Sequence, residues 1–159
     1  MLKLRKNKKG FTLVELIVVI AIMAVLAGTV AGVTVTQLNK QTNNTAQTEV
    51  GNLVKEVQGF ITDYLTTSAT GIMNKSDMET ALEKFGTEEK GGKVTAVATE
   101  GDNANKFTKV AGQNEYQFKV EEVKDSTDAT KVIGLKVTFG CLKKGKTSES
   151  ITADFTYPI

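Results

Sequence analysis

An acidic side chain stands at the edge of a long apolar stretch near the N-terminus. Glu15 precedes residues 16–39, which hold no charged residue, and Thr29 is the only clearly polar side chain between Leu16 and Val33. About 20 such residues in a helix span the bilayer core of about 30 Å. A carboxylate beside a membrane-length run carries a cost of insertion. We therefore expect Glu15 to need a polar or charged partner.

Few other residues have types suited to chemistry. Histidine is absent, which removes the commonest general base at neutral pH and the commonest metal ligand. Cys141 is the one cysteine, so no intrachain disulfide forms. Its expected role is that of a small buried hydrophobe in a strand. The sequence holds no Ser/His/Asp set, no cluster of metal ligands and no phosphate-binding glycine loop. We expect a protein that is not an enzyme and uses no cofactor or metal.

The net charge of +2 comes from the first ten residues, which contain five lysines and arginines and no acid. Without them, 15 basic and 18 acidic residues remain, a net charge of −3. The basic character of the whole chain is therefore no argument for nucleic-acid binding. Because the flanking charge is all N-terminal, the positive-inside rule places residues 1–10 in the cytoplasm and the rest outside.

The residues around Glu15 form a motif. From Lys8 to Met23 the chain reads KKGFTLVELIVVIAIM, which lies between a basic leader and an uncharged run. This segment resembles the class III signal of type IV prepilins and type II secretion pseudopilins. The resemblance implies that a prepilin peptidase cuts between Gly10 and Phe11 and N-methylates Phe11. Gly10 has no side chain, so a protease can approach its backbone closely.

The resemblance also implies a role for Glu15 in assembly. In the family this residue is proposed to pair with the terminal amine of a neighbouring subunit, which here is the amine of Phe11. Packed helices would shield the pair and strengthen its attraction, and the pair would set the register between subunits. Two other interpretations remain: Glu15 is a snorkelling acid of an ordinary anchor, or the segment is a secretory signal peptide. For a signal peptide, the apolar run is too long and starts too close to the leader.

Two glycines interrupt the apolar run where many type IV pilins have a proline. Gly28 and Gly32 lie there, and no proline occurs before Pro158. Glycine weakens a helix by about 1 kcal/mol relative to alanine. Gly28 and Gly32 are therefore candidates for a flexible segment, and close packing between helices is the alternative role.

The apolar spacing predicts helices in the first half of the chain. Steps of three and four continue beyond the apolar run and predict one helix over about residues 12–66; the apolar residues at this spacing are Val50, Leu53, Val54, Val57, Phe60, Ile61, Tyr64 and Leu65. A short second helix is predicted over about residues 77–85. Ser76 and Glu79 have the spacing of a capping box at its start, and Gly86 is a stop signal at its end.

After Gly92 the apolar period changes to two, which predicts strands. Segments rich in Val, Thr, Phe and Tyr occur at residues 93–99, 107–110, 115–123, 131–140 and 149–157. They predict an antiparallel sheet of about four strands over residues 93–157, with one face on the helix.

Two charged turns lie between the strands. The acids Glu121, Glu122, Asp125 and Asp128 suggest a calcium site by analogy with some pseudopilins, but their spacing fits no known loop and favours a solvated turn. The basic residues Lys143, Lys144 and Lys146 offer contacts to DNA or a surface polyanion, and a solvated turn is again the simpler interpretation.

The fold class predicted is α+β with the type IV pilin fold. The long helix has a protruding apolar half and an amphipathic half packed on the antiparallel sheet. We expect a cleaved leader at residues 1–10, a transmembrane and assembly helix at 11–35, and an extracytoplasmic head at 36–159.

The expected function is that of a structural subunit of an extracellular type IV pilus-like filament, used for adhesion, surface motility, biofilm formation or DNA uptake. Its expected partners are identical or related pilins, the prepilin peptidase, the assembly platform and, before assembly, the cytoplasmic membrane. A pseudopilin of a type II secretion-type system is the alternative, followed by a single-pass anchored binding domain. The missing C-terminal disulfide fits a pseudopilin or a Gram-positive type IV pilin.

Overall fold

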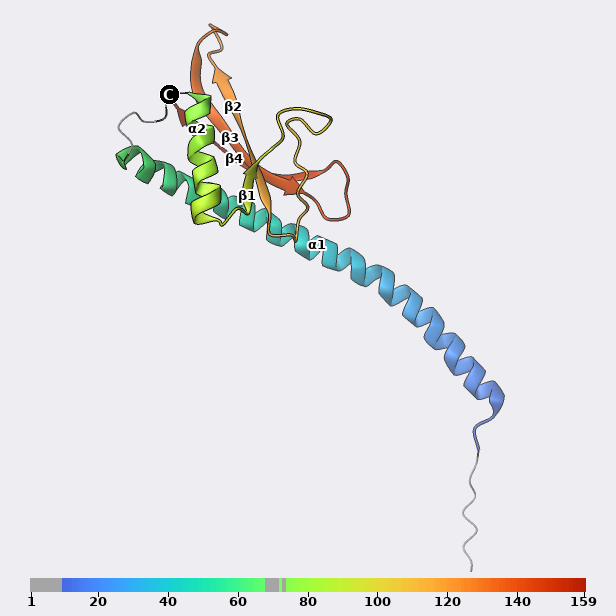
Figure 1. Ribbon diagram of the computed structural model, residues 1–159. Coiled ribbons are helices and arrows are strands. Elements are labelled where there is room, and N and C mark those ends of the chain that lie inside the picture. The colour runs from blue at the N-terminus through green and yellow to red at the C-terminus, as the bar shows by residue number, and fades with distance from the viewer. Residues whose placement is uncertain (1–9, 68–71, 73) are drawn as a thin grey trace, which may run out of the picture. The chain divides into compact units, whose positions relative to one another are not determined.

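The computed structural model describes residues 10–67, 72 and 74–159 of the chain, and the leader residues 1–9 lie outside the described part. The chain forms two compact units, Met1–Leu38 and Asn39–Ile159. A long helix and a four-stranded mixed sheet give the α+β layout shown in Figure 1. This layout fits the type IV pilin fold, as the sequence predicted.

Helix α1 spans Leu13–Thr67 without interruption. Its second half is amphipathic because buried residues recur in steps of three and four, at Ala46, Val50, Leu53, Val57 and Ile61. These side chains belong to the core of the second unit. The observed bounds confirm the long helix that the apolar spacing predicted.

Helix α2, Lys75–Lys84, starts two residues before the predicted bound. Its capping box uses Asn74 and Asp77: the Asp77 N–H donates to Asn74 Oδ1 at 3.0 Å, and the Asn74 N–H donates to Asp77 Oδ2 at 3.1 Å. The predicted box of Ser76 and Glu79 is therefore wrong, because a better cap lies two residues earlier.

Gly86 does not stop the second helix. The chain continues through a π-helical turn, η1, at Phe85–Glu89. A Cβ atom on Gly86 would lie 2.2 Å from the carbonyl oxygen of Val94. The glycine therefore serves the close approach of η1 to the first strand rather than the end of a helix.

The sheet has the order β1-β2-β3-β4, and its strands are β1 (Val94–Ala96), β2 (Tyr116–Lys124), β3 (Val132–Leu142) and β4 (Ser150–Pro158). β3 pairs with β2 and β4 in antiparallel fashion, whereas β1 runs parallel to β2. The expectation of an antiparallel sheet is thus wrong for β1. A parallel neighbour needs a long crossover, which residues 97–115 provide. The expected strand at 107–110 makes only an isolated bridge, between Val110 and Leu142.

The core of the second unit lies between the sheet and the two helices. Alternate residues of β3 point into it and have no exposed surface, namely Leu135, Val137, Phe139 and Cys141. They meet side chains of α1 and of α2, including Met78 and Leu82. The other face of the sheet is partly covered by the crossover, because the Phe107 ring lies against Gly140. Between the crossover and the β3–β4 turn, part of the outer face of the sheet is not covered by other described segments.

Candidate functional site

The candidate processing and assembly segment comprises residues 10–38. Gly10 and Phe11 precede α1 and have no helical structure, and the Phe11 side chain is 87% exposed. Beyond its own chain neighbours, Gly10 would meet no described atom within 4 Å if it carried a Cβ. The peptide bond between these two residues is therefore sterically open in this unit.

Glu15 finds a partner within its own helix turn. The Thr12 N–H and the Thr12 hydroxyl both donate to Glu15 Oε2 at 2.8 Å, and the Glu15 N–H donates to Thr12 Oγ1 at 3.3 Å. This is a reciprocal capping box at the start of α1. The box gives hydrogen-bond partners to the backbone N–H groups of Thr12 and Glu15 at the start of α1. It also engages one carboxylate oxygen of Glu15, Oε2. The sequence contains the Thr-x-x-Glu signal, but sequence reasoning considered Glu15 as an intersubunit partner or a snorkelling acid and missed Thr12.

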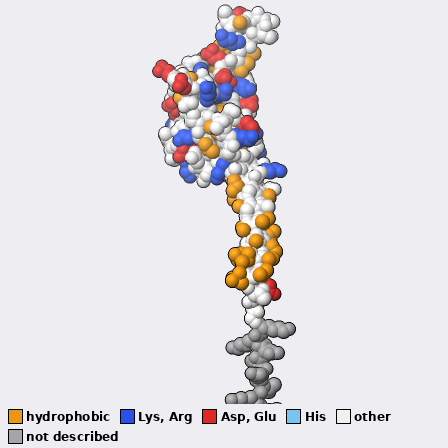
Figure 2. All heavy atoms as spheres, turned by 90° about the vertical axis from the view of Figure 1, so that its right-hand side faces the viewer, with side chains coloured by type: hydrophobic (Ala, Val, Ile, Leu, Met, Phe, Trp, Pro, Cys, Tyr) orange, Lys and Arg blue, Asp and Glu red, His pale blue; other side chains and the backbone are white. Residues whose placement is uncertain are grey.

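The apolar run that follows is exposed in this unit. Figure 2 shows hydrophobic side chains gathered along the N-terminal half of α1. Leu13, Val14 and Leu16 are 60–72% exposed, and the large apolar residues onward to Leu38 are also exposed. The helix is long and apolar enough to cross a membrane. Such a surface is stable only when lipid or another helix covers it.

The polar side chains of the run are satisfied internally. The hydroxyls of Thr29, Thr34 and Thr36 donate to carbonyl oxygens three or four residues earlier, at 2.8–3.2 Å. Internal hydrogen bonds of this kind let hydroxyl groups lie in an apolar environment. Gly28 and Gly32 lie within the unbroken helix and would meet no neighbouring atom if they carried a Cβ. Their predicted flexibility stays a prediction.

The segment matches a known family model. The model is described as the prokaryotic N-terminal methylation motif, and it covers residues 5–31. The chain carries a class III prepilin signal. The methylation motif is consistent with type IV pilins and pseudopilins, and it supports a precursor of one of these two kinds. No curated protein and no solved structure matches the chain.

Three of the four acids of the acidic turn have partners within the chain. Glu121 pairs with Lys119 at 3.1 Å, while Asp125 and Asp128 accept hydrogen bonds from nearby threonines. These hydrogen bonds lower the pKa of both aspartates. Within the described ranges, no three potential ligands among His, Cys, Asp and Glu come together to hold a metal ion. The calcium site suggested by analogy is therefore not supported there.

Two lysines of the basic turn share one acid. Lys143 and Lys146 both bind Glu149, at 2.9 and 3.2 Å, and the hydrogen bond from Lys143 is the main cause of the lowered pKa of Glu149. The third lysine, Lys144, uses its backbone: its N–H donates to Asn43 Oδ1 at 2.7 Å. This contact ties the β3–β4 turn to α1.

Two further titratable groups, Tyr116 and Cys141, lie inside the second unit. The Tyr116 hydroxyl donates to a carboxylate oxygen of Glu49, which joins β2 to α1. Burial and this contact raise the pKa of Tyr116. Cys141 is fully buried, as predicted, and burial followed by the charge of Glu49 raises its pKa to about 11. The Tyr116–Glu49 contact has no local sequence signal, because 67 residues separate the partners.

Proposed function

We propose that the chain is the precursor of a structural subunit of an extracellular, type IV pilus-like helical filament. One observation carries this proposal: Glu15 lies inside the matched methylation motif, at the head of an exposed apolar helix. The capping box uses only one oxygen of this acid, and the matched motif places the acid four residues after Phe11. Fully burying a Val, Leu or Ile side chain contributes about 1.5–3 kcal/mol. Once subunits leave the lipid, bundled helices of neighbouring subunits would keep this surface out of water, which would hold the filament together.

The first proposed step is processing at the cytoplasmic face of the membrane. A prepilin peptidase cuts between Gly10 and Phe11 and methylates the new amine of Phe11. The exposed, non-helical backbone at this junction supports the assignment, because a protease must bind an extended and reachable segment. Residues 1–10 leave as the leader, residues 11–35 stay in the membrane, and residues 36–159 form the head outside.

The second proposed step is registration of one subunit against the next. The capping box occupies Oε2 of Glu15, whereas no side-chain or backbone donor in the described part of the chain binds Oε1. The second oxygen is thus available to the terminal amine of Phe11 from a neighbouring subunit. Because the capping box fixes the carboxylate, the amine would meet it at one position along the helix axis. Such head-to-tail contacts do not close and therefore grow into a helix.

The proposed roles of the filament are adhesion, surface motility, biofilm formation or DNA uptake. The assembly platform in the cytoplasmic membrane would extract each subunit into the growing filament. A short pseudopilus of a secretion system is the second candidate, because the motif match and the free Cys141 fit a pseudopilin equally well. Gly28 and Gly32 would supply flexibility to the helix in either case.

Electron microscopy of producing cells tests the proposal. An antibody raised against residues 74–159 should decorate surface filaments that contain this chain. The variant Glu15→Val should still be processed but should give no filaments, whereas Glu122→Gln, an acid-to-neutral change at an exposed position of β2, should assemble. Normal filament numbers with Glu15→Val would show that the register argument is wrong. Labelling confined to the cell envelope would favour the pseudopilus.

A further inference from the structure

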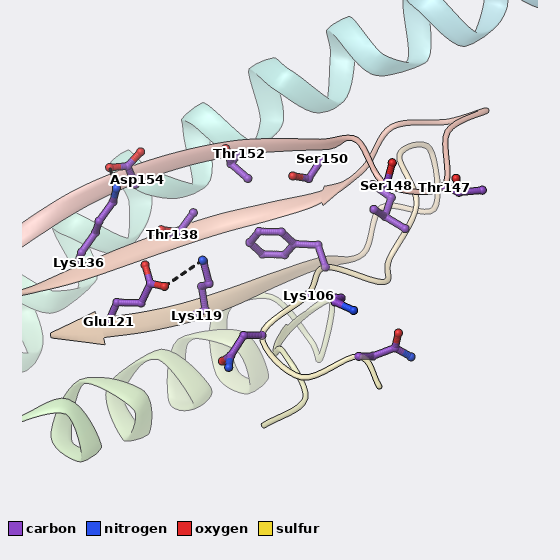
Figure 3. A pocket seen from close by; sticks show the side chains of 14 residues that line it. Lys106, Lys119, Glu121, Lys136, Thr138, Thr147, Ser148, Ser150, Thr152 and Asp154 are labelled. Atoms are coloured by element: carbon purple, nitrogen blue, oxygen red, sulfur yellow. Dashed lines mark hydrogen bonds and ion pairs between the residues drawn. The ribbon is translucent and has the colours of Figure 1, made fainter. Parts of the chain in front are cut away.

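A polar groove lies on the outer face of the sheet, away from the core. It has a volume of about 680 Å³ and is shown in Figure 3. Its floor consists of outward-facing residues of β2, β3 and β4, among them Lys119, Thr138 and Thr152. The crossover around Asn105 and the β3–β4 turn around Ser148 form its sides. This volume falls in the range of small-molecule and oligosaccharide sites.

The hydroxyl groups of the groove are available to a ligand. Thr138, Ser150 and Thr152 form no side-chain hydrogen bond with any other part of the described chain, nor do the amide side chains of Asn103 and Asn105. Thr138 is only 7% exposed, and it borders the groove. Each hydroxyl can donate one hydrogen bond and accept two, and each amide can do both. The groove therefore matches a ligand that carries many donors and acceptors of its own.

Two of the three lysines that line the groove are paired with carboxylates, and the third, Lys106, donates to the backbone carbonyl oxygen of Asp102 at 2.9 Å. Lys119 binds Glu121 at 3.1 Å, and Lys136 binds Asp154 at 3.3 Å. In Figure 3 the first pair lies on β2 and the second joins β3 to β4. A clamp for phosphate or sulfate leaves its cations free for the anion. Lys119 and Lys136 each bind a carboxylate and Lys106 binds a backbone carbonyl, so each lysine of the groove already has a partner, which fits a neutral ligand better than a polyanion.

The groove also has a small apolar wall. Phe107 and Leu142 line it next to the hydroxyl groups, and the Phe107 ring lies over Gly140, where a Cβ would come within 3.1 Å of the ring. Sugar rings present C–H faces between their hydroxyls, so they suit a surface that alternates an apolar patch with polar groups. We propose that this groove binds a neutral glycan chain through Thr138, Thr152 and the neighbouring amides. The assignment does not depend on assembly of the filament.

Titration of the full chain with defined sugars tests this site. The protein is kept in a detergent without a sugar headgroup, and NMR follows the amides of β3 and β4. The probes are chitohexaose, maltohexaose and cellohexaose, with a heparin hexasaccharide as the anionic comparison. At least one neutral probe should give saturable shifts at concentrations of about 10 mM or below.

Matched threonine variants locate the binding. Thr152→Val removes a groove hydroxyl and should weaken binding about tenfold or more. Thr156→Val makes the same change on the same strand but outside the groove, and it should leave binding unchanged. Shifts with heparin alone, no saturable shift with any neutral probe, or equal effects of the two variants would each overturn the proposal. Retained protection of Cys141 from thiol reagents shows that a variant is folded.

Discussion

Replacing Gly86 with alanine should loosen the second unit, although the residue lies in a helical turn. The added Cβ would lie 2.2 Å from the Val94 carbonyl oxygen, so η1 and β1 must move apart. Overpacking of this kind costs about 1–3 kcal/mol. The helix propensity of alanine offsets up to about 1 kcal/mol of that cost. We expect a net loss in the free energy of unfolding of about 1–2 kcal/mol.

Gly59 provides the matched control. It lies on α1, and a Cβ there would meet no atom within 4 Å. Gly59→Ala should therefore stabilise the unit by up to about 1 kcal/mol through helix propensity alone. The same substitution thus has opposite predicted signs at two glycines, and the approach of Val94 to Gly86 is the reason.

The buried thiol of Cys141 is a built-in reporter for this comparison. It is the one cysteine of the chain, lies fully buried in the central strand β3 and has a pKa raised to about 11, so reagents reach a reactive thiol only when the unit opens. When opening is a rapid pre-equilibrium, the labelling rate follows the population of the open state. Gly86→Ala should react about 5–30-fold faster than the unchanged protein, and Gly59→Ala should react more slowly. Equal rates in the two variants would refute the proposed close approach, provided that both label equally fast when unfolded in denaturant.

Three further predictions follow from single contacts. Asn43→Ala removes the hydrogen bonds to the Lys144 backbone and should lower the free energy of unfolding by about 1 kcal/mol, measured by thiol labelling; an unchanged rate would contradict a clamp there. Thr12→Val removes the hydroxyl of the capping box, so amide hydrogen exchange at Glu15 should become about fivefold faster, whereas Thr12→Ser should keep the unchanged rate. The pKa of Asp125 is lowered in the folded state, so its stabilisation is present above the ordinary carboxyl pKa and is lost as the pH falls below it. Asp125→Asn should therefore lose less stability than the unchanged protein on acidification, as measured by denaturant unfolding, and identical pH profiles would contradict this assignment.

The long helix and the position of Glu15 could be predicted because they depend on local patterns. An uncharged run followed by steps of three and four requires one helix with two kinds of surface, and α1 has this form. The buried Cys141 followed from the alternation of β3 in the same way. Such features repeat every few residues, so a single sequence is enough to reveal them.

The errors concern properties that a period-two pattern does not contain. Alternation places Val94 and Tyr116 in strands but carries no direction, so the parallel pairing of β1 depends on the long crossover. Residues 107–110 alternate like a strand, yet Phe107 turns onto Gly140 and covers the sheet. The Tyr116–Glu49 contact requires the complete tertiary fold. The capping box of Thr12 and Glu15 has a local signal, the Thr-x-x-Glu spacing, and could therefore have been predicted as well.

The central claim is that Phe11 becomes the N-terminus of a filament subunit. Mass spectrometry of the mature protein, purified from the cells that make it, tests this most directly. If the claim is right, the mature protein has an N-terminal peptide that begins at Phe11 and carries one methyl group on its amine. A mature N-terminus at Met1, or one near residue 30 produced by a conventional signal peptidase, would contradict it.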